Sequence, residues 1–321
     1  MSNRGSTFGS TAYGGPGWSP RSRTHAGEIG GLWAACGLEN EWAPLEAVLL
    51  HRPGPELAAE DAAAAQLLER PDAARALAQH DALAAAYRAA GVAVHYVEPA
   101  VSPASPNQIF CADLFAMTPE GAILARPAST VRAGEERWVA RRLADLGVPI
   151  LATLTGTAVF EGADLLWLDR RTAAIARGLR PNQAAIGQIG LLLARQGVEL
   201  MPVDLPWGTM HLMGLLRIFD GDLAAAWPRR TPHALVEALT ARGYRVAALP
   251  EEASQSQNVA FNCVTLGPRR ILMVAGHPRT QDFLAGLGLK IEALELDELA
   301  KAAGAIGCLT GIVARQVGPA A

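Results

Sequence analysis

The sequence lacks the cysteine patterns that hold structural zinc ions or pair into disulfides. Its four cysteines are far apart and none forms a CxxC pair: they are Cys36, Cys111, Cys263 and Cys308. Residues 1–26 are rich in Gly, Ser, Arg and Pro and contain no hydrophobic segment typical of a secretion signal. These features predict a reduced, cytoplasmic protein with free thiols.

The sequence also lacks a strong excess of charge and a long apolar run. Lys and Arg number 28 and Asp and Glu 31, for a formal net charge of -3, which argues against nucleic acid as a partner. The Ala-rich stretch 62–90 is interrupted by charged residues, so no segment has the length and apolarity of a membrane span. With 50% hydrophobic and 18% charged residues, the chain has the composition of a globular protein with a substantial core.

What the sequence does contain is a repeated order of two strands, a helix and a strand. The clearest repeat has a hairpin at 164–177, a helix at 182–195 and a strand at 199–203. A second repeat follows between 211 and 249, and its first strand is expected at 211–219. Each unit buries one face of its sheet against its helix and needs neighbours to complete the core. A closed ring of units and an ordinary open α/β sheet both satisfy this requirement.

Residues 45–121 also contain recognisable strand, helix and turn patterns. A short apolar strand is predicted at Leu45–Leu50, followed by two helices at 56–68 and 72–90. Thr118-Pro119-Glu120-Gly121 predicts the turn of a hairpin whose first strand is expected at 108–117.

Polar residues at the ends of the predicted strands mark a candidate site, together with a cysteine on a glycine-rich loop. Each alone has a plain structural alternative, such as a solvent-facing Asp113, a hydrogen-bonded core His211 or a buried Cys308 that packs as a small hydrophobe. The candidates are Asn107, Phe110, Asp113, Arg132, Glu161, Asp164, Arg180, His211 and Cys308.

Taken together, these residue types are those of cysteine nucleophile chemistry on a cationic substrate. A thiolate is a strong nucleophile, and its formation needs a lowered pKa or a nearby base. A histidine can serve as acid and base near neutral pH. Carboxylates can orient the histidine and bind positive charge, and two arginines suit a substrate carboxylate. Glycines around Cys308 would let a substrate approach the backbone closely.

The order of these motifs resembles that of the guanidine-modifying enzymes of the pentein fold, namely arginine deiminases, dimethylarginine dimethylaminohydrolases and amidinotransferases. Phe160-Glu161-Gly162-Ala163-Asp164 is similar to the family's FEGGD motif, with Ala in fourth place. Met210-His211-Leu212 resembles its catalytic-histidine motif, and the segment from Gly304 to Thr310 resembles its nucleophile loop. Asn107-x-x-Phe110-x-x-Asp113 is similar to the segment whose aspartate binds the guanidinium.

The resemblance covers roughly residue 42 to the C-terminus. It implies an α/β fold, a five-bladed α/β propeller (pentein) of ββαβ units with pseudo-fivefold symmetry, and no metal or organic cofactor. We therefore predict a partly flexible N-terminal arm at 1–41 and a single catalytic domain at 42–321. The implied partner is a small guanidino substrate; the oligomeric state stays open, with a homodimer among the alternatives.

The resemblance also implies a role for each matching residue. Cys308 would be the nucleophile, His211 the acid and base, and Glu161 the partner that orients His211. Asp113 would bind the guanidinium, beside Asn107 and Phe110. Arg132 and Arg180 lie where the family places arginines for the substrate's α-carboxylate.

Three functions fit these residues. The first is a hydrolase that converts dimethylarginine or a related arginine derivative to a ureido product such as citrulline through a covalent thiouronium. The second is an amidinotransferase or arginine deiminase that uses the same site. The third is a propeller retained as a binding module without turnover.

Met213 departs from the pattern of arginine deiminases and amidinotransferases, in which an aspartate stands two places after the histidine. On a strand, His211 and Met213 would point to the same face, so this position would share the cleft with the histidine. Methionine is flexible and apolar and suits contact with alkyl groups. The substitution therefore favours an N-alkylated guanidine; alternatively, Met213 belongs to the core and Asp164 supplies a second substrate contact.

Overall fold

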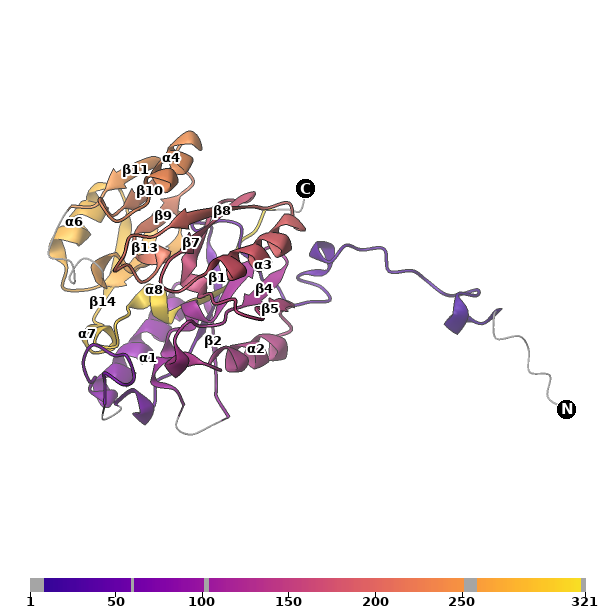
Figure 1. Ribbon diagram of the computed structural model, residues 1–321, viewed down its shortest axis with the longest axis horizontal. Helices are drawn as coiled ribbons and strands as arrows, with labels where there is room; N and C mark the ends of the chain where they lie inside the picture. Colours follow the sequence, from indigo (N-terminus) through magenta and orange to yellow (C-terminus); the bar gives the residue numbers. More distant parts are fainter. Residues whose placement is uncertain (1–8, 59–60, 101–103, 251–258, 319–321) are drawn as a thin grey trace.

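The computed structural model describes residues 9–58, 61–100, 104–250 and 259–318. In these ranges the strands form five sheets of three strands each, and a helix packs on the outside of each sheet (Figure 1). The sheets are blades of one ring, which confirms the predicted five-bladed α/β propeller.

Four blades follow one another along the chain in the predicted order. In each blade the first two strands are antiparallel, and the third lies parallel to the second after a helix. The parallel step is why the helix is needed, since a tight turn cannot join parallel strands. The second and third blades are β3 (Phe115–Thr118), β4 (Gly121–Leu124), α2 (Glu136–Asp145), β5 (Ile150–Thr153), and β6 (Leu165–Asp169), β7 (Thr172–Arg177), α3 (Gln183–Ala194), β8 (Glu199–Asp204). The fourth and fifth are β9 (Leu216–Asp220), β10 (Leu223–Ala226), α4 (His233–Ala241), β11 (Arg245–Ala248), and β12 (Val264–Gly267), β13 (Arg270–Val274), α6 (Pro278–Gly286), β14 (Lys290–Leu294).

The first blade closes the ring by joining the two ends of the chain. Strand β15 (Gly311–Arg315) pairs antiparallel with β1 (Leu45–Leu50), and β2 (Ala93–Tyr96) pairs parallel with β1 after helix α1 (Ala73–Ala89). This blade has the same pattern as the others, but its first strand comes from the C-terminus. The pairing of β1 with β15 decides between the closed ring and the open sheet that the repeat pattern left open.

Burial falls from the first two strands of a blade to the third. Strands β3 and β4 are buried along their whole length, whereas β5 and β11 are exposed at both ends. Because β3 and β4 are fully buried, their sequences are mostly apolar and lack the apolar–polar alternation of a half-exposed strand.

Some predicted elements differ in the structure. The predicted strand at 108–117 begins only at Phe115, because residues 106–113 form two short 3-10 turns. The strand predicted at 211–219 begins at Leu216, after a 3-10 turn at Leu212–Gly214. The predicted helix at 56–68 is limited to a 3-10 turn at Pro55–Ala58 among the described residues. In the first two cases, the site residues lie on the turns that precede a strand.

The N-terminal segment is partly docked on the propeller. Figure 1 shows its indigo part extending away from the ring. Cys36 and Leu38 nevertheless belong to the core, and Gly37 exchanges backbone hydrogen bonds with β15. The docked part therefore includes residues that the prediction assigned to the arm at 1–41.

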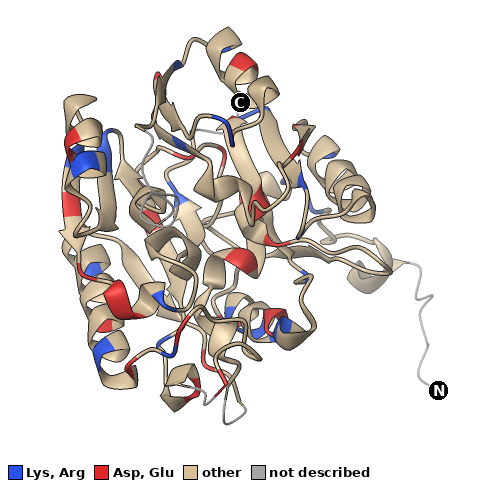
Figure 2. Cartoon of the chain, turned by 60° about the vertical axis from the view of Figure 1, so that its left-hand side comes forward, with Lys and Arg blue, Asp and Glu red and all other residues tan. Residues whose placement is uncertain are grey.

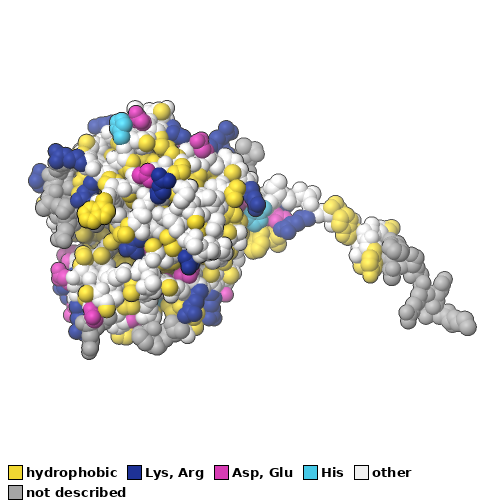
Figure 3. Space-filling model, in the orientation of Figure 1, with side chains coloured by type: hydrophobic (Ala, Val, Ile, Leu, Met, Phe, Trp, Pro, Cys, Tyr) yellow, Lys and Arg dark blue, Asp and Glu magenta, His cyan; other side chains and the backbone are white. Residues whose placement is uncertain are grey.

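The surface carries charges of both signs without a continuous basic face. Figure 2 shows Lys and Arg interspersed with Asp and Glu over the outer helices, and Figure 3 shows hydrophobic side chains scattered in small groups on one face. Among the described residues, no helix combines the length and apolarity needed to cross a membrane.

Candidate active site

Cys308 lies on α8 (Ile306–Leu309), a single helical turn just before β15, and its side chain is buried. Asn262 contacts it twice: Asn262 Nδ2 donates to Cys308 Sγ at 2.8 Å, and Asn262 Oδ1 accepts from the Cys308 N–H at 3.2 Å. Burial raises the pKa of the thiol, as does the charge of Asp113, while the hydrogen bond from Asn262 and the charge of Arg217 act to lower it. A cation placed near the sulfur would therefore favour the thiolate.

Two glycines allow the close packing around this nucleophile turn. A Cβ on Gly304 would overlap the ring of Phe110, and a Cβ on Gly307 would overlap Asn262 Oδ1 and crowd Arg217. Neither glycine has a positive φ. They are needed for close approach, not for an unusual backbone conformation.

His211 faces a group of carboxylates. Its Nε2 lies 2.7 Å from Glu161 Oε2 and 3.9 Å from Asp164 Oδ2, and its Nδ1 lies 3.9 Å from Asp113 Oδ1. Burial alone would lower the pKa of His211, but the charges of Asp113 and Asp164 and the hydrogen bond to Glu161 raise it to about 9. His211 is therefore an imidazolium at neutral pH, ready to donate a proton.

Glu161 is fully buried and is held by cations on both oxygens. Arg180 Nη1 donates to Glu161 Oε1 at 3.0 Å, and His211 contacts Glu161 Oε2. Burial raises the pKa of Glu161, but the hydrogen bond to His211 and the charges of His211, Arg132 and Arg180 lower it to about 2. Glu161 is an anion that fixes the orientation of His211 and stabilises its charge.

Asp113 offers a free anionic oxygen to the pocket. Its Oδ2 accepts from Arg132 Nη1 at 2.6 Å, whereas its buried Oδ1 has no hydrogen-bond partner. An unpaired buried carboxylate oxygen is costly unless something binds it. A cation that donates hydrogen bonds, such as a guanidinium, fits this position.

The two arginines differ in what they can offer a ligand. The N–H groups of Arg132 point at protein acceptors: Asp113, Glu135 at 2.9 Å, and the carbonyls of Asn107 and Phe110. Arg132 is thus engaged with protein groups while it also lines the pocket, and its role toward a substrate carboxylate stays a prediction. Arg180 keeps a buried Nε without a partner, so it has a donor left for a ligand.

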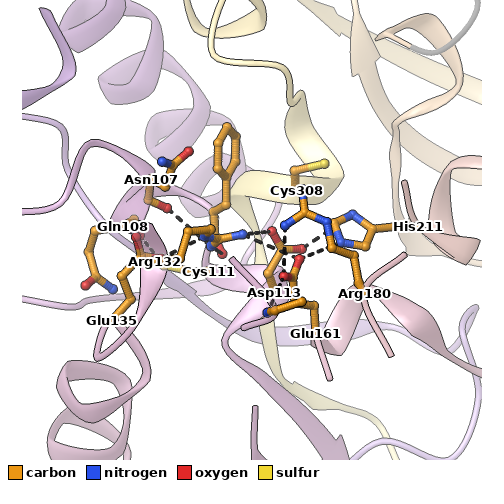
Figure 4. A network of polar contacts seen from close by, with 12 residues as sticks. Asn107, Gln108, Cys111, Asp113, Arg132, Glu135, Glu161, Arg180, His211 and Cys308 are labelled. Atoms are coloured by element: carbon orange, nitrogen blue, oxygen red, sulfur yellow. Dashed lines mark hydrogen bonds and ion pairs between the residues drawn. The ribbon is translucent and has the colours of Figure 1, made fainter. Parts of the chain in front are cut away.

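The structure brings most of the predicted residues together in one pocket. Figure 4 shows Cys308, His211, Asp113, Glu161 and the arginines converging from separate blades. The pocket is lined by Gln66, Asn107, Phe110, Asp113, Arg132, Arg180, Met210, His211, Ala302, Ala303, Gly304 and Cys308.

Asp164 and Met213 lie elsewhere. Asp164 is fully buried, accepts from the Leu212 N–H at 2.9 Å and is not among the residues that line the pocket; its substrate contact stays a prediction. Met213 is not on a strand, yet it lines a second cavity that also contains His211 and Cys308. Asn107 does line the pocket, and its side-chain Nδ2 donates to the carbonyl of Ala65 at 2.7 Å.

Sequence reasoning missed three residues of this site. Asn262 holds Cys308, Arg217 lies within 3.5 Å of Asn262, and Glu135 pairs with Arg132. None of them belongs to a motif. The one available signal was at Arg217, a charged residue between the apolar residues Leu216 and Ile218 of β9.

Asp113, Glu161 and His211 could in principle hold a metal ion, since each offers a ligand atom within 4.8 Å of the others. Their donors are poorly suited to one. Arg132 contacts both carboxylates and Arg180 contacts Glu161, so a divalent cation would have to approach or displace these positive charges. The surroundings fit an organic cation bound to Asp113 better than a metal centre.

Comparison with known proteins places this site in a family. The model of the eukaryotic N,N-dimethylarginine dimethylhydrolase family matches residues 55–276. The chain belongs to this family. The match covers three of the five blades completely, parts of the other two, and all of the candidate residues except Cys308.

Individual members of the dimethylarginine dimethylhydrolase family support the match. The chain is 27% identical over 268 residues to the N(G),N(G)-dimethylarginine dimethylaminohydrolase of Streptomyces coelicolor, covering 83% of this chain and 96% of that protein. It is 25% identical over 244 residues to the enzyme of the same name from Pseudomonas aeruginosa, covering 76% of this chain and 90% of that protein.

Solved structures show the same fold. The Pseudomonas aeruginosa enzyme in complex with citrulline has a TM-score of 0.69 at 21% identity, covering 85% of this chain and all of that one. An amidinotransferase of the saxitoxin biosynthetic pathway from Microseira wollei has a TM-score of 0.72 at 15% identity, covering 90% of this chain and 99% of that one. The chain thus shares the pentein fold with hydrolases and transferases alike, as the motif resemblance predicted.

Proposed function

We propose that this protein hydrolyses the guanidine group of dimethylarginine, or of a related arginine derivative, to a ureido product such as citrulline. The observation that carries the proposal is that Cys308, His211 and the free oxygen of Asp113 line one pocket. The two relatives from Streptomyces coelicolor and Pseudomonas aeruginosa are both named as dimethylarginine dimethylaminohydrolases, which supports this proposal.

Binding begins at Asp113. Its unpartnered Oδ1 accepts hydrogen bonds from the substrate guanidinium, and the free donor of Arg180 suits the substrate's carboxylate. The guanidinium also neutralises the Asp113 charge, which otherwise raises the pKa of Cys308. Substrate binding therefore favours the thiolate at the moment when it is needed.

Cys308 Sγ then attacks the central carbon of the guanidinium and forms a tetrahedral adduct. His211, charged at neutral pH, donates its proton to the substituted nitrogen, and the carbon–nitrogen bond breaks to release the amine. A thiouronium remains on Cys308. Glu161 keeps the imidazole in place during this transfer.

Water completes the reaction. The now neutral His211 accepts a proton from a water molecule, whose oxygen attacks the thiouronium carbon. The carbon–sulfur bond breaks, Cys308 leaves as a thiolate, and the ureido product is released. None of these steps requires a metal or an organic cofactor.

The amidinotransferase alternative differs only in the second half of the reaction, where an amine replaces water. Incubation with the guanidino substrate and no added amine separates the two. Steady release of a ureido product and an amine supports hydrolysis, whereas dependence of turnover on an added amine supports transfer.

We predict that Cys308→Ser abolishes turnover of dimethylarginine while substrate binding is retained, because the alcohol is far less nucleophilic than a thiolate. Citrulline formation and calorimetric binding measure the two effects. Cys36→Ala is the matched control, since Cys36 is a buried thiol outside the pocket. A Cys308→Ser variant with near-normal turnover contradicts the proposal.

A further inference from the structure

A second cavity opens beside Cys308, next to the guanidinium pocket. The two cavities share Met210, His211, Ala303 and Cys308, so the sulfur and the imidazole stand between them. Including its mouth, the second cavity measures about 920 Å³, compared with about 360 Å³ for the first. It is much larger than a dimethylamine leaving group requires.

One wall of the second cavity carries a fixed positive charge. The guanidinium of Arg230 lies over the ring of Trp227, 4.5 Å from the ring centre, and Trp227 is itself almost fully buried. Stacking on the indole holds Arg230 in place at the cavity wall. Among the described residues, no carboxylate lies within ion-pair distance of it, and no acidic residue lines this cavity.

The direction of the reaction connects this cavity to the leaving amine. With the guanidinium on Asp113, the nitrogen that leaves must face His211, which supplies its proton. His211 lines both cavities, so a substituent on that nitrogen extends from the first cavity into the second. Met213 and Arg230 both line the second cavity, so both are available to such a substituent.

We propose that the second cavity is a subsite for a leaving amine that carries a carboxylate, which Arg230 binds. This inference rests on the proposed function, and it extends the substrates to guanidines whose departing nitrogen bears a short acidic chain. Cys308 Sγ bonds to the central carbon, the bond to the substituted nitrogen breaks, and His211 gives that nitrogen its proton. The released product is an amino acid, and the thiouronium proceeds to the ureido product as before.

An alternative is that the cavity selects substituents by their apolar surface alone, through Met213 and Trp227. In that case the charge of Arg230 has no part in recognition. A pair of ligands of nearly equal size separates the two: Nω-carboxymethyl-L-arginine and its uncharged amide, Nω-carbamoylmethyl-L-arginine.

The test measures binding to the Cys308→Ser variant by calorimetry, so that it does not depend on turnover. We expect the carboxylate ligand to bind roughly tenfold tighter than the amide, as for one charge-assisted pair. Adding Arg230→Gln removes this preference. Adding Arg229→Gln, which changes the neighbouring exposed arginine outside the cavity, leaves it unchanged.

Equal affinity for the two ligands, or a preference that survives Arg230→Gln, overturns the subsite. The outcome is separate from that of the proposed function, which is tested by turnover of dimethylarginine in the natural chain. A carboxylate preference that depends on Arg230, without turnover of dimethylarginine, supports the subsite and contradicts only the hydrolase.

Discussion

Asn262 shows how a single uncharged residue can prepare a buried nucleophile. Its amide donates to the Cys308 sulfur and accepts from the Cys308 backbone, so it fixes both the position and the environment of the thiol. Burial opposes ionisation of Cys308, and a hydrogen bond to the sulfur is worth more to the thiolate than to the thiol. Asn262 is therefore a positioning residue for the nucleophile.

We predict that Asn262→Ala lowers kcat/KM by roughly 10- to 100-fold, the value of one hydrogen bond to a charged group. The cause is a higher pKa of the Cys308 thiol. The rate of alkylation by iodoacetamide against pH measures that pKa directly. If activity falls while the alkylation profile stays where it was, Asn262 acts through the fold and not through the thiol.

His211 makes the stability of the fold depend on pH, and the groups around its ring decide the direction of this dependence. Its pKa in the fold is about 9, above the ordinary 6.5, because nearby carboxylates outweigh burial. Protonated His211 thus stabilises the fold fully below pH 6.5, and this contribution is lost as the pH rises through 9. The same deprotonation removes the acid that the first chemical step requires.

We predict an alkaline limb of kcat/KM near pH 9 that moves to lower pH in Asp164→Asn. Asp164 raises the pKa of His211 by its charge but does not line the pocket, and an asparagine oxygen can still accept from Leu212 N–H. The full pH–rate profile is the measurement. An alkaline limb that does not move contradicts the assignment of this limb to His211.

At the level of single residues, motifs and their order predicted four residues of the site but not the charged residues Glu135 and Arg217. Cys308, His211, Glu161 and Asp113 come together, although their chemical roles stay a prediction. The pairing of Arg132 with protein carboxylates could not be predicted, because it depends on Glu135 and on the burial of the whole cluster. Asn262 was missed since a lone asparagine has no distinctive spacing.

The elements that hold the site are short turns and not long helices or strands. Cys308 lies on α8, Asp113 on a 3-10 turn at Cys111–Asp113, and His211 immediately before the turn at Leu212–Gly214. Hydrophobic periodicity predicted the blades well, since strands and helices have strong periods. It extended strands into these turns because a single turn is too short to show a period of its own.

We predict that Gly307→Ala reduces activity by roughly the same 10- to 100-fold as the loss of Asn262, because the new methyl group displaces that side chain from Cys308. In an ordinary helix the same change stabilises the protein by up to about 1 kcal/mol. Gly187→Ala in α3 is the matched control, since nothing lies near its Cβ. Turnover and thermal unfolding of both variants check this; an active Gly307→Ala enzyme would show that the turn can relax.

At the scale of the molecule, closure of the ring was the feature that local patterns left undecided. Strand β1 pairs with β15, whose residues lie more than 260 positions later in the chain. Patterns within a short segment cannot predict a pairing between such distant residues. Only the resemblance to a family pointed to the closed propeller. Closure matters for function because it brings Cys308, close to the C-terminus, against Asp113 and His211 from other blades.

The boundary of the N-terminal arm and the oligomeric state could be predicted only in part from the sequence. Composition separated the extended N-terminal residues from the ring, yet it could not show that Cys36 and Leu38 enter the core, since neither belongs to a periodic segment. The division into an arm at 1–41 and a catalytic domain at 42–321 stays a prediction, as does the homodimer.

The most direct test of the central claim compares kcat/KM for asymmetric dimethylarginine and for free arginine, with no amine added. Met213, beside Cys308, offers an apolar contact to N-methyl groups and no carboxylate to an unsubstituted guanidinium. We therefore predict that dimethylarginine is the better substrate and yields citrulline and dimethylamine in equal amounts. A preference for arginine of about tenfold or more, equivalent to roughly 1.4 kcal/mol, would contradict the account.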